Sequence, residues 1–129
     1  MGGYLLDTHA AIWQFNGDTA LSNAAREIIY DSSNRIYISV VSVWEVAIKI
    51  NIGKLKFAGN TENFLHIADL DGIAIFPVKT KHIMIYESLP LIHRDPFDRL
   101  LIATALSEKM TIITADKDIA KYDVPQVWQ

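Results

Sequence analysis

"HRDPFDRLLIATALSEKMTIITAD", residues 93–116, decides the fold class, because a helix-forming run is followed at once by a strand-forming run. Asp95 before Pro96 matches a helix N-cap followed by proline at the first helical position. Asp98 would then lie in the first turn, where its charge favours the positive end of the helix dipole by about 0.3 to 1 kcal/mol. A helix start alone explains both carboxylates, so a functional role for Asp98 needs support from elsewhere in the chain.

The rest of the chain repeats this alternation of β-rich and helical runs. Strands are expected at 4–6, 35–41, 73–78 and 111–114, with a last short strand around Val127. Helices are expected at 9–15, 23–30, 42–55, 61–70 and 96–109, with a short one at 116–122. Another helix is expected to run through Glu87, and Thr80 is predicted to cap it. Such alternation predicts βαβ units with right-handed crossovers. The expected fold class is therefore α/β, a three-layer α/β/α sandwich around a central, mainly parallel sheet of four to five strands.

The composition is that of one ordinary globular domain, which we expect to span residues 1–129. A formal net charge of −3 argues against a protein that coats nucleic acid through bulk electrostatics, since such domains are usually basic. The sequence has no cysteine, which fits a reducing compartment, and no apolar run of about 20 residues that could cross a bilayer. We therefore expect a cytoplasmic protein.

Four acids fall where strands lead into helices. Asp7 follows the first strand, Glu45 lies early in the helix after the second, Asp98 opens its own helix, and Asp116 stands just beyond "TIIT". In an open α/β sheet, ligands bind outside the carboxyl ends of the strands, near the point where strand order reverses. Each acid alone could be a helix cap or, for Glu45, the partner of Ser42 in a capping box. Together they predict one shared carboxylate site.

Such a carboxylate site could not stay fully ionised unaided. Two unit charges about 4 Å apart repel by about 4 kcal/mol at an effective dielectric constant near 20, so the site either retains protons or binds a divalent cation. Hard oxygen ligands select Mg²⁺ or Mn²⁺, and such an ion keeps waters that leave room for a phosphate oxygen and an attacking hydroxide. The pattern therefore indicates hydrolysis of phosphodiester bonds.

Four segments resemble, in order, the successive motifs of the PIN-domain nucleases, specifically the VapC-like toxins of bacterial toxin–antitoxin pairs. They are "YLLDTHAAIW" (4–13), "SVVSVWEVAIKINIGKL" (39–55), "HRDPFDRLLIATAL" (93–106) and "TIITADKD" (111–118). The resemblance covers nearly the whole chain. It implies metal-binding, catalytic acids at Asp7, Glu45, Asp98 and Asp116, whereas Asp95 is left to helix capping.

The resemblance also implies a Mg²⁺- or Mn²⁺-dependent endoribonuclease that acts on a structured cellular RNA. Such toxins commonly form homodimers, and a cognate antitoxin protein silences them by inserting a segment into the active-site groove. Basic side chains in that groove would otherwise meet RNA phosphate. The nearest candidates by sequence are Arg94, Arg99, Lys49 and Lys54.

Three other functions compete with this one. A hydrolase with an aspartyl nucleophile would place a second Asp two positions after Asp7, where His9 stands. A phospho-receiver domain would need a further acidic pair at the sheet edge and a lysine after the last strand, and Lys117 stands in the wrong relation to Asp116. A catalytically inert regulatory or binding module is disfavoured because the set of acids is complete.

The histidines and the large aromatic residues indicate no separate site. The four histidines are scattered along the sequence: His9, His66, His82 and His93. A lone histidine is more often a packing or surface residue than a ligand. Trp13, Phe15 and Trp44 lie at helical spacing and are predicted to be core or interface residues, although an exposed Trp44 could stack a base.

Overall fold

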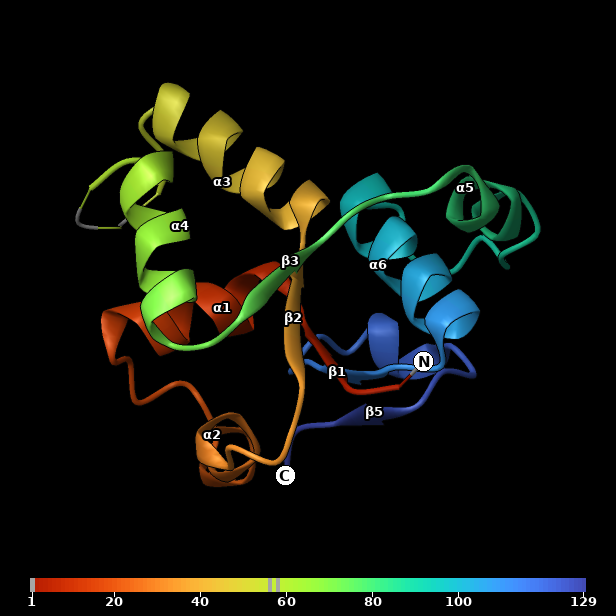
Figure 1. Ribbon diagram of the computed structural model, residues 1–129. Helices are drawn as coiled ribbons and strands as arrows, with labels where there is room; N and C mark the ends of the chain where they lie inside the picture. The colour runs from red at the N-terminus through yellow and green to blue at the C-terminus, as the bar shows by residue number, and fades with distance from the viewer. Residues whose placement is uncertain (1, 56, 58) are drawn as a thin grey trace.

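The computed structural model describes residues 2–55, 57 and 59–129 (Figure 1). The strands of this part of the chain are β1 (Tyr4–Leu6), β2 (Ile36–Ser39), β3 (Ala74–Phe76), β4 (Thr111–Ile113) and β5 (Gln126–Val127). The helices are α1 (Thr8–Asn16), α2 (Asn23–Tyr30), α3 (Val40–Asn51), α4 (Thr61–Leu70), α5 (Thr80–Glu87) and α6 (Pro96–Glu108). A short 3₁₀ helix, η1 (Ile119–Lys121), precedes β5.

The sheet is parallel throughout, in the order β3-β2-β1-β4-β5. This confirms the predicted parallel α/β sandwich, with five strands in the described part of the chain. The chain runs outward from β1 through β2 to β3 and then returns to form β4 and β5 on the other side of β1. Strand order therefore reverses between β1 and β4, which is where ligands bind in sheets of this kind.

Helices cover both faces of the sheet, and the alternation of side chains along each strand fills two separate cores. Leu6 packs with residues of α1, α2, α3 and α4, whereas its neighbour Leu5 packs with residues of α6 and η1. Figure 1 shows α1, α3 and α4 on one side of the sheet and α5 and α6 on the other. Both leucines are 0% exposed, and replacing either with alanine is expected to cost about 2 to 5 kcal/mol.

Helix α3 begins two residues earlier than the sequence predicts. Its N-cap is Ser39, whose hydroxyl accepts a hydrogen bond from the Val41 N–H at 3.1 Å. The second strand therefore ends at Ser39 and does not extend to residue 41. The predicted capping box of Ser42 with Glu45 is wrong, because Ser42 already lies inside the helix. Its buried hydroxyl is instead 2.8 Å from the hydroxyl of Thr8.

The other helix ends agree better with the sequence. Asp95 is the N-cap of α6, and its Oδ1 accepts the Phe97 N–H at 2.8 Å, as predicted. Thr80 is the first residue of α5 and not its cap, since Lys79 occupies that position. The helix expected at 116–122 shortens to the 3₁₀ helix η1.

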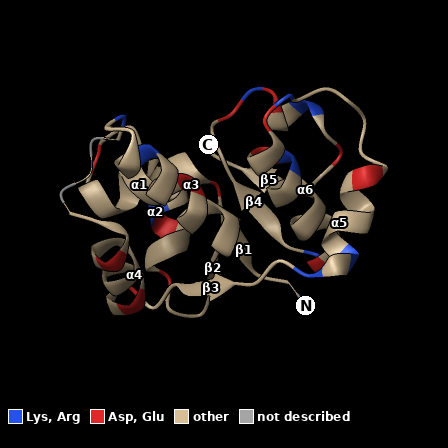
Figure 2. Ribbon diagram, turned by 90° about the horizontal axis from the view of Figure 1, so that it is seen from above, with Lys and Arg blue, Asp and Glu red and all other residues tan. Residues whose placement is uncertain are grey.

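Charged residues are confined to the helices and connecting segments, and the strands carry none (Figure 2). No helix in the described part of the chain is long and apolar enough to span a membrane. The charged side chains at the carboxyl ends of the strands therefore stand against an apolar sheet, where their mutual interactions are poorly screened.

Candidate active site

Asp7 joins the ends of the two central strands. Its Oδ1 accepts the Ala10 N–H at 2.7 Å and so caps α1, while its Oδ2 accepts the hydroxyl of Thr114 at 2.5 Å. Thr114 follows β4, so this hydrogen bond lies at the point where strand order reverses. Asp7 is only 4% exposed, and burial raises the pKa of Asp7 despite these two hydrogen bonds.

Asp98 and Asp116 meet at the imidazole of His93. The Nε2 atom of His93 is 3.1 Å from Asp98 Oδ2 and 3.2 Å from Asp116 Oδ2. The other oxygen of Asp116 accepts the N–H groups of Asp118 at 2.7 Å and Ile119 at 3.2 Å, but the N-cap of η1 is Asp118 and not Asp116 as predicted. Asp116 thus binds backbone N–H groups with one oxygen and faces His93 with the other, whereas Asp7 binds Ala10 and Thr114 with its two oxygens.

His93 acts as a hydrogen-bond donor in this group. Its Nδ1 accepts the backbone N–H of Asp95 at 3.2 Å, so in the neutral ring the proton is on Nε2, which faces both carboxylates. Metal-binding histidines usually show the reverse arrangement, in which the second ring nitrogen donates to an acceptor. Sequence reasoning missed His93 because one of its carboxylate partners, Asp116, comes from a distant segment. The only local signal was its place two residues before the capping Asp95.

The group formed by His93, Asp98 and Asp116 has more negative than positive charge. Burial, followed by the nearby charges of Asp95 and Asp7, raises the pKa of Asp98 to about 7 even though His93 acts to lower it. Partial burial also acts to raise the pKa of Asp116, but the hydrogen bonds from Asp118, Ile119 and His93 outweigh it, so this pKa is lowered overall. Asp98 is therefore the acid whose proton a bound cation would most readily replace.

Glu45 stands apart from the other predicted acids. In the described part of the chain, the metal-ligating atoms that lie within 4.8 Å of one another belong to His93, Asp98 and Asp116. Glu45 Oε1 instead accepts the hydroxyl of Thr8 at 2.7 Å, and its Oε2 is 3.3 Å from Lys49 Nζ. Because Thr8 directly follows Asp7, Glu45 is connected to the site through one intervening side chain.

Two adjoining pockets open beside these acids. A pocket of about 210 Å³ is lined by Asp7, His9, Trp13, Ala115 and Asp116. A second pocket of about 290 Å³ shares His9 and Trp13 with the first. Its lining also includes Lys49 and Lys54. Two of the predicted basic residues therefore line a groove that leads away from the acids.

Arg99 does not belong to that groove, so its predicted role in meeting RNA phosphate is wrong. The side chain is buried, and its Nη1 donates to the carbonyl of Pro90 at 2.8 Å and to the hydroxyl of Tyr122 at 3.1 Å. The guanidinium also lies 4.8 Å from the centre of the Tyr86 ring. These contacts fix the segment before α6 and thereby the position of His93. Arg94, in contrast, is exposed.

A model of the PIN domain family matches residues 4–125. The chain belongs to the PIN-domain family. The predicted resemblance to this family is thus confirmed, and PIN domains are generally nucleases that need a divalent metal. No curated protein sequence matches the chain.

Solved structures of similar fold come from bacterial complexes. A chain of VapBC2 from Rickettsia felis bound to a promoter DNA fragment is 19% identical, with 100% of both chains covered and a TM-score of 0.70. A chain of DNA-bound VapBC from Salmonella typhimurium is 14% identical over 98% of both chains, with a TM-score of 0.68. A chain of FitAcB from Neisseria gonorrhoeae is 22% identical over 95% of both chains, with a TM-score of 0.63. The PIN domain therefore shares its fold with these proteins.

The donor set of this PIN domain fits a divalent metal that prefers oxygen. Asp98 and Asp116 each place a carboxylate oxygen within 4.8 Å of the other, and Asp7 lies close enough to raise the pKa of Asp98. The nitrogen available at His93 carries a proton in the neutral ring, so the groups that could bind a cation are the carboxylate oxygens. Such ligands suit Mg²⁺ and Mn²⁺, whereas zinc sites favour cysteine and histidine.

Proposed function

We propose that this PIN domain is a metal-dependent endoribonuclease whose site comprises Asp7, Glu45, Asp98 and Asp116, within a single catalytic domain of residues 1–129. The observation that carries the proposal is the meeting of Asp98 and Asp116, from distant segments, at one nitrogen of His93 beside the reversal of strand order, with Asp7 near enough to raise the pKa of Asp98. Carboxylates held together in a partly buried place without enough positive charge are stabilised by a cation. The proposed cofactor is Mg²⁺ or Mn²⁺.

A bound ion of this kind lowers the pKa of its water and stabilises negative charge on a phosphate. Hydrogen bonds within the protein order the carboxylates before any ion binds. Ala10 and Thr114 fix the two oxygens of Asp7, and His93 holds Asp98 against Asp116. Because the ligands are already ordered, little conformational entropy is lost when the substrate phosphate arrives.

Glu45 would act from the edge of the site. The Thr8 hydroxyl orients its Oε1, and Lys49 balances the charge on its Oε2. Lys49 and Lys54 line the groove beyond and would pair with phosphates on either side of the cleaved bond.

Cleavage assays with purified protein test the nuclease proposal. We expect single-stranded RNA and loops of structured RNA to be cut in Mg²⁺ or Mn²⁺ and to stay intact in EDTA. A matched control is Asp69→Asn, which removes an exposed acid on α4 and should leave cleavage unchanged. Cleavage that persists in EDTA would contradict the metal mechanism.

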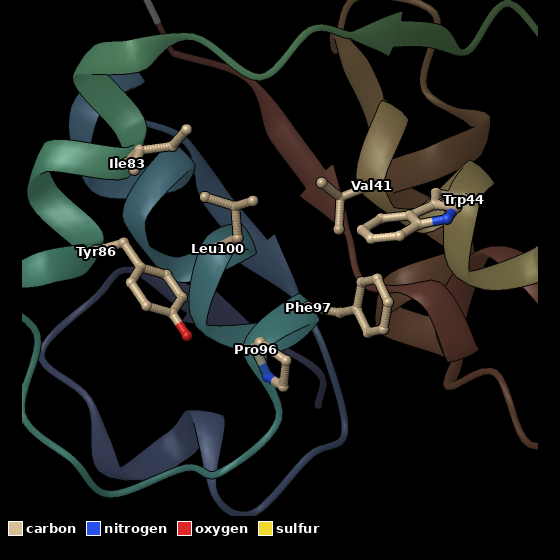
Figure 3. A pocket seen from close by; sticks show the side chains of 7 residues that line it. All are labelled: Val41, Trp44, Ile83, Tyr86, Pro96, Phe97 and Leu100. Carbon is tan, nitrogen blue, oxygen red and sulfur yellow. The ribbon is translucent and has the colours of Figure 1, made fainter. Parts of the chain in front are cut away.

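We further propose that the protein is the toxin of a toxin–antitoxin pair acting in the cytoplasm, with a cognate antitoxin and a second copy of itself as partners. An apolar groove of about 320 Å³ supports protein partners (Figure 3). Val41 and Trp44 of α3 line it together with residues of α5 and α6. Trp44 is 61% exposed, and its ring lies edge-to-face on that of Phe97, with the ring centres 5.1 Å apart. We assign this groove to the second copy, and the acid-lined groove to a segment of the antitoxin.

Two measurements test these partners. Light scattering should give the mass of a dimer, and Ile83→Asp, which places a charge on an exposed apolar position of the groove, should give a monomer. Expression with and without the adjacent small open reading frame should show growth arrest and new RNA ends only without it. Healthy cells in both cases would argue against a toxin.

A further inference from the structure

A row of aromatic side chains borders the acids on the side of the groove that leads to the lysines. The ring centres of His9 and Trp13 are 5.9 Å apart, and those of Trp13 and Trp128 are 5.7 Å apart. His9 and Trp13 belong to α1, which Asp7 caps, while Trp128 comes from the segment after β5. The first two therefore hold a fixed position relative to Asp7.

The row is rigid on one side and open on the other. Trp13 and Trp128 are half-buried and pack against the core beneath α1 and α2, as the sequence predicts for Trp13. The backbone carbonyl of Trp128 also accepts a hydrogen bond from the hydroxyl of Ser22, the N-cap of α2. His9 is exposed, and both His9 and Trp13 line the pocket that contains Asp7 and Asp116. Trp13 is therefore held by core packing on one side and lines the pocket on the other, so the surface that it forms with His9 is ordered before a ligand binds.

The chemistry of the groove changes along its length. Acids that fit a metal lie at one end, the aromatic surface follows, and Lys49 and Lys54 line the adjoining pocket together with Asp18. Lys54 forms no ion pair with a carboxylate in the described part of the chain, so its charge is available to a ligand. A single nucleic acid strand presents phosphates and flat bases in alternation, and proteins bind it with basic side chains and aromatic stacking surfaces.

We propose that His9 and Trp13 form a stacking subsite for an unpaired nucleobase next to the phosphate that is held at the acids. The inference rests on the nuclease function proposed above and extends it, because it names the side chains that would hold a base beside the phosphate at the acids. Stacking engages the π-face that every base has, so this subsite favours unpaired over paired nucleotides and does not select one base.

Binding of two matched probes tests the subsite. The protein carries Asp98→Asn to prevent cleavage, and the probes are an oligoadenylate decamer and an abasic ribose-phosphate decamer of the same charge. We expect His9→Ala to weaken binding of oligoadenylate by about 5- to 100-fold and to leave binding of the abasic chain within about two-fold. Lys54→Ala should weaken both probes equally, because it removes a contact to phosphate. His66→Ala, at an exposed position on α4, should change neither.

NMR signals of the tryptophan indoles give a second readout that does not depend on a variant folding. Oligoadenylate should shift the Trp13 indole signal and leave that of Trp44, in the apolar groove, unchanged. Trp13→Leu, which keeps an apolar side chain against the core, should reproduce the loss seen with His9→Ala. Equal effects of His9→Ala on both probes, or a shift at Trp44 alone, would overturn the stacking subsite.

The outcomes separate the two proposals. RNA cleavage by the wild-type protein, combined with equal affinity for the two probes, would refute the stacking subsite and leave the nuclease standing. Absence of both cleavage and binding would refute both. Tight binding of oligoadenylate that depends on His9, without cleavage in any metal, would retain the subsite and refute the nuclease.

Discussion

Two histidines of this PIN domain share one hydrogen-bonding pattern in opposite electrostatic settings. The Nδ1 atoms of His82 and His93 both accept a backbone N–H, and both Nε2 atoms face a carboxylate. His82 meets one acid, Glu108, at 2.7 Å, and Lys81 lies 3.0 Å from the same oxygen. His93 meets Asp98 and Asp116, with Asp7 and Asp95 nearby and no lysine among its ion pairs in the described residues.

The difference in charge has a measurable consequence. The hydrogen bond from His82, together with Lys81, lowers the pKa of Glu108, whereas burial and neighbouring acids raise the pKa of Asp98 to about 7. At His82, the charge of Glu108 is therefore balanced by Lys81, and the contact is structural. At His93, the same imidazole geometry leaves the charges of Asp98 and Asp116 without enough positive charge to balance them. Only the second place is suited to a divalent cation.

The largest expected contrast is between the acids themselves. Asp98→Asn should lower RNA cleavage by about 100-fold or more, because it removes a metal ligand, and should leave the fold intact or more stable, because it removes a repelling charge. Glu108→Gln should leave cleavage unchanged. It should lower the free energy of unfolding by about 1 to 3 kcal/mol, because a buried charge-assisted hydrogen bond is lost. Cleavage rates and urea unfolding are measured for both variants. Loss of cleavage in Glu108→Gln together with normal cleavage in Asp98→Asn would contradict this prediction.

A smaller contrast is expected between the histidines. His93→Ala should weaken Mn²⁺ binding and cleavage by about 10- to 100-fold with little change in stability, since it releases two acids from their common donor. His93→Gln, which keeps an N–H donor, should recover part of the loss. His82→Ala should leave Mn²⁺ affinity unchanged and destabilise the fold, because its ring is fully buried. Calorimetric titration with Mn²⁺ separates these outcomes, and equal affinities in wild type and His93→Ala would exclude the positioning role.

The smallest expected effect is on the pH dependence of stability. The Asp98 carboxyl has a pKa of about 7 in the folded protein and 3.8 in the unfolded chain. Between these two pH values, the folded protein keeps the proton that the unfolded chain has released. The stability of the metal-free protein should therefore fall as the pH rises from about 4 to 7, on the order of 1 kcal/mol after solvent screening of this partly buried group.

Glu108 contributes in the opposite sense. Its lowered pKa adds stability that is present above its unfolded value of 4.5 and is lost as the pH falls through the folded value. Urea unfolding between pH 4 and 8 should show the decline in wild type and a flatter profile in Asp98→Asn. An equal decline in both proteins would assign the effect to another group.

The sequence predicts those parts of the structure that depend on local patterns. The parallel sheet and its layers follow from the alternation of strands and helices, and the capping roles of Asp7 and Asp95 follow from their neighbours. The start of α3 was missed because two serines compete as caps, and only the fold shows that Ser42 turns inward to Thr8.

The parts that could not be predicted depend on long-range contacts. Arg99 has the composition of a phosphate-binding residue, yet Pro90 and Tyr122 bury it. His93 gains its role only because α6 and the segment after β4 bring Asp98 and Asp116 to the same nitrogen. Spacing along the sequence carries no information on either contact.

The most direct test is an NMR titration of the Asp98 side-chain carboxyl carbon, with and without Mg²⁺. We expect a pKa of about 7 in the metal-free protein, and a value far below neutrality when Mg²⁺ saturates the site and replaces the proton. A metal-free pKa near 3.8, or a raised value that Mg²⁺ does not change, would contradict a cation site built from these acids.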